Sequence, residues 1–306
     1  MRCTPATLPP KMRGATWALG NFDGVHLGHR AVLGAARAAL PDAPLGVVTF
    51  EPHPRAHFAP ESPAFRLTTP EARARRLAKL GVEAVCEVPF DADLAALDPA
   101  AFARLVLSNG LGARHVTVGA DFRFGARRAG DAETLRALGD EMGFGVTVAP
   151  MVALPGGPVS STRIREALTD GRPEDAAAML GHLHRIEGEV IHGEKRGRTL
   201  GYPTANMALE GLHLPAFGVY AVTVDVLTGP HAGTHDGAAS LGVRPQYGGE
   251  VPNLETFLLD FDGDLYGQTL SVGLVRYLRP EATFDSLDDF LAQMARDVEE
   301  ARGILA

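Results

Sequence analysis

Leu19-Gly20-Asn21-Phe22-Asp23-Gly24-Val25-His26-Leu27-Gly28-His29 decides the fold, because it joins an apolar segment to a helical pattern that follows it. Residues three apart share one helix face, so both histidines are expected to point the same way from a helix N-terminus. Free N–H groups and the helix dipole favour anions there, and glycines let a ligand approach closely. The stretch predicts a nucleotide triphosphate pocket, with neither a Walker A loop nor a G-x-G-x-x-G fingerprint. Its candidate phosphate-binding residues are Gly20, Asn21, Phe22, Asp23, Gly24 and Gly28, beside His26 and His29.

Strand-like and helix-like segments alternate through the first half of the chain. Helices are predicted to begin after the N-cap residues Thr69, Asp98 and Asp131, the first two followed by proline. The alternation predicts a Rossmann-like α/β domain, a parallel sheet covered by helices. Ligands bind beyond the carboxyl ends of such strands, so the segments 21–29, 49–54 and 119–125 are expected to converge there. The expected strands are 16–19, 45–50, 84–88, 115–118 and 145–152, and the helices are expected to end near Gly81, Asn109-Gly110 and Gly143.

The pattern changes after Gly181 to strands separated by turn residues. Asp262-Gly263 predicts a hairpin turn, and helical periodicity returns only at the end of the chain, with Ser286 as a candidate N-cap. This half is expected to form a small antiparallel β-barrel with a terminal helix. The expected domains are residues 1–180 and 181–306. The expected elements of the second are strands 185–192, 218–226, 238–242, 253–261 and 268–278 and a helix 286–305.

The composition limits the classes of function. The 306 residues are 45% hydrophobic and 22% charged, which is typical of a globular protein long enough for two domains. The formal net charge of -8 argues against nucleic-acid binding, which needs a basic face, and requires any phosphate site to be built locally. The sequence has no secretory signal and no stretch of membrane-spanning length, so we expect a cytoplasmic protein. Its expected partners are small-molecule substrates, neither nucleic acid nor membrane, and a homo-oligomer is left open.

Two further segments of the first half carry groups suited to nucleotide chemistry. The segment Ser160-Ser161-Thr162-Arg163-Ile164-Arg165 opens a short helix. Its hydroxyls, free N–H groups and guanidinium groups together form a phosphate clamp. The segment Gly119-Ala120-Asp121-Phe122-Arg123-Phe124-Gly125 follows a predicted strand.

With these segments in this order, the first half resembles the adenylyltransferase module of the bacterial bifunctional riboflavin kinase/FAD synthetase family, which carries an H-x-G-H signature. The resemblance implies that His26 and His29 hold the ATP phosphates and that residues 160–165 complete the triphosphate site. It also implies that an FMN phosphate oxygen attacks the α-phosphorus of ATP, which gives FAD and pyrophosphate. Alignment and stabilisation of charge on the pyrophosphate would carry this step, and imidazolium, arginine and Mg²⁺ suit that role. At the nucleotide and flavin cleft it places Gly119, Asp121, Phe122 and Phe124.

The second half contains another group of candidate residues. The run 188–201 is rich in glycine and basic residues, and Gly193, Lys195 and Gly197 are candidates for phosphate binding. The Thr204 hydroxyl and the Asn206 carbonyl are hard oxygen ligands, suited to Mg²⁺ that bridges nucleotide phosphates. Glu255 lies in a predicted strand with apolar residues on both faces, so periodicity leaves its side open.

This half resembles the riboflavin kinase module of the same family, whose G-R-x-L-G-[FY]-P-T-A-N motif is present from Gly197 to Asn206. The resemblance implies that Thr204 and Asn206 serve Mg²⁺ and ATP. It implies that Glu255 is the catalytic glutamate, a general base toward the riboflavin 5′-hydroxyl. Arg279 is a candidate for contact with a flavin phosphate, or it caps a strand.

Together the two motif sets predict a two-step enzyme. The barrel phosphorylates riboflavin with ATP to FMN, and the α/β domain adenylylates FMN with ATP to FAD, both with Mg²⁺. One alternative is a single-function FMN adenylyltransferase whose barrel only binds flavin, which is favoured by Gln246-Tyr247 at a position where the family commonly has Thr-Phe. The other is a flavin-binding regulator without catalysis, which would leave both phosphate clamps unexplained.

Overall fold

The computed structural model describes residues 1–192, 201–209, 211–246 and 249–306. The predicted Gly193, Lys195 and Gly197 therefore lie outside the described residues. The chain divides into two compact units. The first comprises Met1–Pro63 and Pro70–Ser160, and the second comprises Ala64–Thr69 and Ser161–Ala306.

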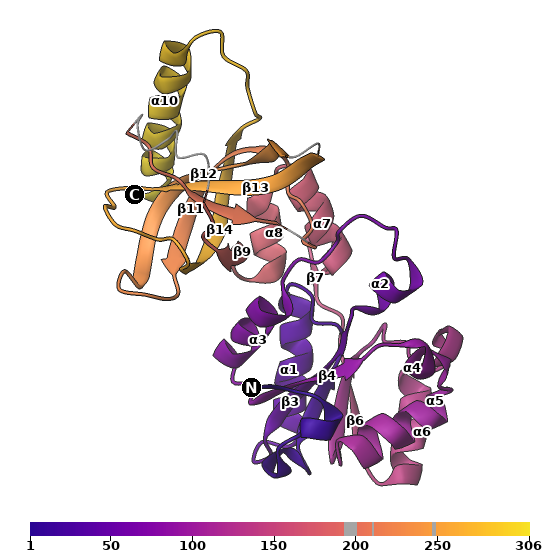
Figure 1. Ribbon diagram of the computed structural model, residues 1–306. Coiled ribbons are helices and arrows are strands. Elements are labelled where there is room, and N and C mark those ends of the chain that lie inside the picture. The colour runs from indigo at the N-terminus through magenta and orange to yellow at the C-terminus, as the bar shows by residue number, and fades with distance from the viewer. Residues whose placement is uncertain (193–200, 210, 247–248) are drawn as a thin grey trace. The chain divides into compact units, whose positions relative to one another are not determined.

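The first unit is built on a six-stranded sheet in the order β1-β4-β3-β2-β5-β6, with every pair of neighbours parallel. Helices α1 and α3 lie on one side and α5 and α6 on the other (Figure 1), which confirms the predicted α/β fold. The strands are β1 (Arg2–Cys3), β2 (Thr16–Leu19), β3 (Leu45–Glu51), β4 (Ala84–Pro89), β5 (His115–Gly119) and β6 (Gly145–Ala149). The α-helices are α1 (Leu27–Ala39), α2 (Pro54–Phe58), α3 (Pro70–Lys79), α4 (Ala92–Ala96), α5 (Pro99–Phe102) and α6 (Ala132–Met142). Shorter elements are η1 (Pro5–Thr7), η2 (Pro10–Met12), η3 (Ala103–Gly110), η4 (Ala126–Arg128) and the hairpin β7 (Ala153–Leu154) and β8 (Gly157–Pro158).

Two hydrophobic cores cover the two faces of this sheet, because successive strand residues point to opposite sides. Trp17 and Leu19 of β2 pack in the core that includes α5, η3 and α6, whereas Ala18 packs with α1 and α3. Gly46 lies opposite Trp17 in the neighbouring strand, where a Cβ would come within 2.3 Å of the indole ring. A glycine is therefore required there, and the indole keeps the first core filled.

Local differences from the predicted elements have physical causes. The strand expected over 145–152 ends at Ala149, because Pro150 cannot donate a ladder hydrogen bond. The helix expected from Asp98 to Gly110 begins as α5 and continues as the π-helical η3. The two-residue strand β1 was not predicted, since so short a segment has no readable period; it pairs with β4.

The second unit is a six-stranded antiparallel sheet in the order β10-β13-β12-β11-β14-β9. A bridge between Ile191 and Asn206 links its two ends, so the sheet is a nearly closed barrel, as expected. The strands are β9 (His184–Glu189), β10 (Ala205–Ala208), β11 (Gly218–Val226), β12 (Gly233–Gln246), β13 (Gly249–Leu258) and β14 (Thr269–Arg279). The helices are α7 (Ser161–Thr169), α8 (Pro173–Leu180) and α10 (Leu287–Leu305).

The hairpin predicted at Asp262-Gly263 is wrong. These residues join β13 to β14, and the two strands are not neighbours in the sheet. The dipeptide makes a turn of the chain, but the barrel places β12 and β11 between the strands that it connects.

The terminal helix α10 is attached to the barrel by a buried ion pair. Ser286 caps its N-terminus as expected and accepts a hydrogen bond from the Asp289 N–H at 3.1 Å. Arg279, the last residue of β14, donates to Asp297 of α10 through Nε at 2.9 Å and Nη2 at 2.7 Å. Asp297 is only 5% exposed, so this bidentate pair is shielded from water.

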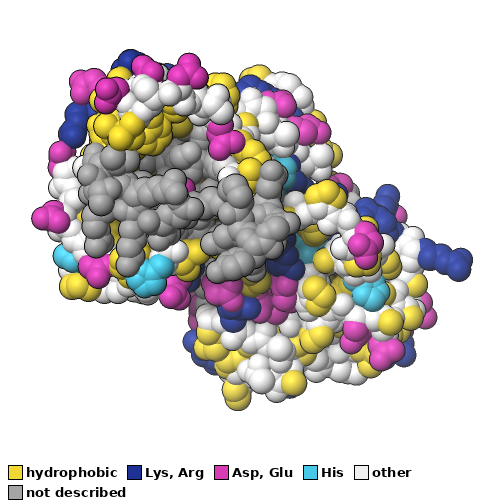
Figure 2. Space-filling view, turned by 45° about the horizontal axis from the view of Figure 1, so that its top comes forward, with side chains coloured by type: hydrophobic (Ala, Val, Ile, Leu, Met, Phe, Trp, Pro, Cys, Tyr) yellow, Lys and Arg dark blue, Asp and Glu magenta, His cyan; other side chains and the backbone are white. Residues whose placement is uncertain are grey.

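No helix of the described ranges combines the length and the hydrophobicity that crossing a bilayer demands. On the face drawn in Figure 2, acidic and basic side chains of the described residues are interspersed rather than gathered by sign. This distribution agrees with the expectation that nucleic acid is not a partner.

The buried His184 makes the barrel sensitive to acid. It is 3% exposed at the start of β9, and burial, with His213 and His182 nearby, lowers its pKa to about 3. An unfolded histidine titrates near pH 6.5, so between the two pKa values only the unfolded chain binds the proton. The free energy of unfolding therefore falls as the pH drops below about 6.5, by roughly 2 kcal/mol near pH 5 from this group.

Urea unfolding followed by circular dichroism near pH 7 and near pH 5 measures this contribution. His184→Gln is expected to lose less stability on acidification than the unchanged chain, by about that amount. His192→Gln, a substitution at an exposed histidine of the same unit, is the matched control. Equal pH dependence in His184→Gln and the unchanged chain would contradict the assignment.

Candidate active sites

The loop between β2 and α1 is held in a strained shape by its own apolar side chains. Phe22 and Val25 have left-handed backbones, with φ of 53° and 48°, and their side chains are fully buried. Such a conformation is costly for a residue with a Cβ, and most of all for the β-branched Val25. Burial compensates for the strain, and the loop delivers a fixed backbone to the carboxyl edge of the sheet.

The two histidines meet at the N-terminus of α1. His26 is the N-cap, and its Nδ1 accepts a hydrogen bond from the His29 N–H at 3.3 Å. Their rings stack with centroids 3.6 Å apart, which confirms that both point the same way. Because Nδ1 of His26 accepts, its proton lies on Nε2, which is a donor suited to a phosphate oxygen.

His29 is neutral in the free protein at neutral pH. Burial, the neighbouring His26 and the Arg73 guanidinium hold the pKa of His29 well below its ordinary value. Its Nδ1 is buried, and within the part of the chain that the structure describes it neither accepts nor donates a hydrogen bond. A bound polyanion would favour the charged form, so an imidazolium beside the pyrophosphate stays a prediction.

The segments after β3 and β5 supply further groups of the first unit. Thr49 donates its hydroxyl to the Asn21 carbonyl at 3.1 Å, so the ends of β2 and β3 meet as predicted. After β5, Phe122 and Phe124 stack at 5.6 Å, and Phe124 and Gly130 exchange backbone hydrogen bonds that close the loop.

Aromatic rings continue from this loop along one side of the first unit. The ring centroids of Phe124 and Phe102 are 5.6 Å apart, and those of Phe102 and Phe50 are 6.2 Å apart. The Phe50 centroid lies 5.8 Å from that of Phe90. The row ends at Phe58, which is 69% exposed and 5.7 Å from Phe90. The sequence predicts only Phe124 of this row as a site residue, because the other members come from separate elements that only the fold brings together. A partly exposed aromatic row suits a flat ring system.

The serine- and arginine-rich segment forms helix α7, as expected for 161 onward, and packs in the second unit. Arg165 donates through Nε to the Phe65 carbonyl at 2.5 Å and lies over the Phe65 ring. Ser160, Ser161, Thr162 and Arg163 lie at the start of the helix. The clamp of these residues with His26 and His29 stays a prediction.

In the second unit the predicted Thr204, Asn206 and Glu255 lie together. Asn206 and Glu255 are direct partners across β10 and β13, and the Thr204 hydroxyl donates to Glu255 Oε2 at 3.4 Å. Glu255 is half-buried on the face of β13 away from the barrel core, because Leu254 and Leu258 fill the core face. The structure thus decides the side that periodicity left open.

Asn253 orients this group and was not predicted. It is 7% exposed, and its Nδ2 donates to Asn206 Oδ1 at 3.2 Å. Asn206 in turn donates through Nδ2 to the Thr204 carbonyl at 3.2 Å. The sequence signal was its spacing, since Asn253 stands two residues before Glu255 and shares its strand face. The chain of amides fixes an oxygen of Asn206 beside the carboxylate.

Each half of the chain matches a family of known proteins. The FAD synthetase family model matches residues 8–163, and the riboflavin kinase model matches residues 180–305. A bifunctional riboflavin kinase/FMN adenylyltransferase of Pseudomonas fluorescens is 42% identical over 305 residues, 98% of this chain and 96% of that protein.

The chain belongs to the bifunctional riboflavin kinase/FMN adenylyltransferase family. The enzyme of this name from Escherichia coli K12 is 41% identical over 291 residues, 94% of this chain and 92% of that protein. A crystal structure described as a macrolide-efflux protein from Streptococcus pneumoniae matches with a TM-score of 0.86 and 31% identity, covering 99% of this chain and 98% of that one.

Family membership confirms the prediction of a two-step enzyme with ATP, riboflavin and FMN as substrates. Neither the kinase-silent barrel nor the flavin-binding regulator is favoured. Tyr247, part of the departure behind the first alternative, lies outside the described residues. Arg279 is bound to Asp297, as described above, so its guanidinium anchors α10, and its contact with a flavin phosphate stays a prediction.

Proposed function

We propose that the two activities reside in separate sites on separate domains, residues 1–180 for FMN adenylylation and residues 181–306 for riboflavin phosphorylation. The observation that carries the first assignment is the stacked pair of His26 and His29 at a helix N-terminus. The second assignment rests on Glu255 beside Thr204 and Asn206.

At the first site, the α1 N-terminus and the imidazole N–H groups would bind the ATP triphosphate, since both favour anions. An FMN phosphate oxygen attacks the α-phosphorus, the bond to the bridging oxygen breaks, and pyrophosphate leaves with that electron pair. Each donor in place for the pyrophosphate is worth about 3–4 kcal/mol of barrier. The phenylalanine row would pack against the flavin ring.

At the second site, Glu255 would accept the proton of the riboflavin 5′-hydroxyl. The hydroxyl oxygen of riboflavin meanwhile forms a bond to the γ-phosphorus of ATP. ADP leaves with the electrons of the broken bond, which gives FMN. A carboxylate is a weak base for an alcohol, so the proton moves late and orientation of the hydroxyl contributes as much. The Thr204 hydroxyl donates to one oxygen of Glu255 and so orients the carboxylate that would accept the proton.

Mg²⁺ fits the donors of the second site. Thr204 Oγ1, Asn206 Oδ1 and the Glu255 carboxylate are hard oxygen ligands, of the kind that Mg²⁺ prefers. Across the described ranges, no cluster of three or more His, Cys, Asp or Glu is placed to hold a metal. We propose that Mg²⁺ would be held here together with ATP and would reduce the charge on its phosphates. We also propose that both reactions take place in the cytoplasm.

A time course with riboflavin, ATP and Mg²⁺, resolved by chromatography, tests the function. FMN is expected to rise first and then give way to FAD. Chelation of Mg²⁺ is expected to slow both steps by about 100-fold or more, because phosphoryl charge is then left unshielded. FMN formation at an unchanged rate in chelator would exclude the proposed metal, and FAD without prior FMN would exclude the proposed order.

A further inference from the structure

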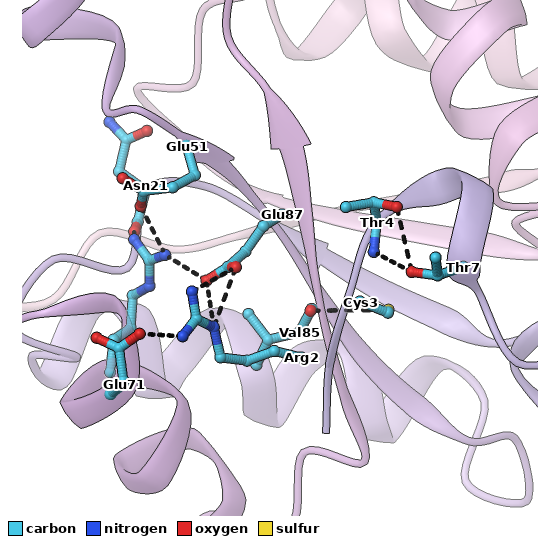
Figure 3. Close-up of polar contacts among 10 residues, drawn as sticks. Arg2, Cys3, Thr4, Thr7, Asn21, Glu51, Glu71, Val85 and Glu87 are labelled. Atoms are coloured by element: carbon cyan, nitrogen blue, oxygen red, sulfur yellow. Dashed lines mark hydrogen bonds and ion pairs between the residues drawn. The ribbon is translucent and has the colours of Figure 1, made fainter.

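A buried guanidinium lies beside the nucleotide loop. Arg73 of α3 is 2% exposed, and its Nη1 donates to the Asn21 carbonyl at 3.3 Å. Its Nη2 donates to Glu51 Oε2 at 3.3 Å and to Glu87 Oε1 at 3.1 Å. Figure 3 shows Asn21, Glu51 and Glu87 converging from separate elements on this position. Arginine is almost never buried without such partners, so the contacts are specific.

The Asn21 carbonyl is the point at which the loop is held. It accepts from the Thr49 hydroxyl at 3.1 Å as well as from Arg73, so both of its lone pairs are used. Phe22, the next residue, begins the left-handed part of the loop. Strained backbone persists only when its surroundings determine it, and Arg73 is one of the groups that do so.

The network continues outward to the surface. Arg2 of β1 donates through Nη2 to Glu87 at 2.9 Å, and its Nη1 bonds Glu71. Exposure of the side chains rises along this path, from 2% at Arg73 through 11% at Glu87 and 36% at Arg2 to 54% at Glu71. Exposed ion pairs contribute little, so the coupling to the loop should weaken toward Glu71.

We propose that Arg73 is a positioning residue for FMN adenylylation, which fixes the Asn21 carbonyl and thereby the loop that ends in His26 and His29. This inference rests on the proposed assignment of that loop to the triphosphate. Arginine is needed because a planar group with several donors reaches one carbonyl and two carboxylates at once, whereas lysine is a point charge. Without it, Glu51 and Glu87 would lose the cation that they share.

A graded series of variants tests the proposal in the full chain. Arg73→Met is expected to lower kcat for FAD formation from FMN by about 100-fold, the effect of a small misplacement of reacting groups. Arg73→Lys should recover part of the rate, and Glu87→Gln should lie between Arg73→Met and the unchanged chain. Glu71→Gln is the matched control at the exposed end and should be unchanged. Riboflavin phosphorylation by the same molecules should proceed at the unchanged rate. KM for FMN should also stay unchanged, because Arg73 is proposed to position the loop and not to bind the flavin.

A double-variant cycle separates positioning from general destabilisation. If Arg73 acts through the loop, its effect on kcat should largely vanish in the His29→Ala background, whereas a structural effect would add to it. Wild-type kcat in Arg73→Met with a defective His29→Ala would overturn this inference alone. A fully active His29→Ala would overturn the assignment of the loop and the inference with it. Should Arg73→Met fail to fold, additive losses in Arg73→Lys would overturn the proposal.

Discussion

Replacement of Glu255 by glutamine is expected to lower the rate of riboflavin phosphorylation by about 10²- to 10⁴-fold, the range of a general base. Glutamine keeps the shape of the side chain and an oxygen that can accept from the Thr204 hydroxyl, but it cannot take a proton. The loss should fall on kcat, because the carboxylate is proposed to act on the hydroxyl in the transition state. Conversion of supplied FMN to FAD should proceed at the unchanged rate, because we assign that reaction to the other domain.

The assay measures FMN from riboflavin and FAD from FMN in the same preparation of Glu255→Gln. Asp236→Asn removes another carboxylate, at an exposed position on the neighbouring strand β12, and is expected to keep both activities. Phosphorylation at the unchanged rate would remove Glu255 from the reaction. Loss of both activities in a folded variant would argue against independent sites.

Much of the fold could be predicted because its signals are local. The strand β11 has the predicted bounds, and Asp98 and Asp131 cap the predicted helices by accepting hydrogen bonds from backbone N–H groups. The order of the strands in the barrel is not local. The turn at Asp262-Gly263 carries a hairpin signal, but the strands it joins pair elsewhere because closure of the barrel decides the neighbours. A dipeptide contains no information about that closure.

Some residues of the candidate sites could likewise be predicted from the sequence, and others could not. Motif residues such as Thr204 and Glu255 could be named because the chain resembles the riboflavin kinase module at these positions. Asn253 and Arg73 could not, since each works through a side-chain contact that the tertiary fold creates, with Asn206 in one case and the Asn21 carbonyl in the other. The charge state of His29 could not be predicted from the sequence either, because it depends on burial and on the same Arg73.

Replacement of His29 by alanine is expected to lower FAD formation from FMN by about 10²- to 10³-fold, the cost of one donor aimed at developing charge. His29 stacks on His26 and its ring centroid lies 4.8 Å from that of the strained Phe22, so its ring also shapes the surface that the triphosphate would meet. Its pKa lies well below the ordinary value, so the free imidazole is neutral near pH 7 and a bound polyanion would raise that pKa. Riboflavin phosphorylation should be unchanged, which is the reverse of the result for Glu255→Gln.

The control for this variant is His115→Ala, which removes a histidine of the same unit at the opposite end of the sheet. His115 begins β5, and its imidazole bonds the Thr147 hydroxyl at 2.8 Å, so its loss perturbs the unit without reaching the loop. Measurement of kcat and KM for ATP in both variants distinguishes a role of His29 in holding the pyrophosphate from an effect on the stability of the unit. FAD formation at the unchanged rate in His29→Ala would show that the stacked histidines do not hold the pyrophosphate. An equal loss in His115→Ala would trace the defect to stability, because the two imidazoles share a unit but not a site.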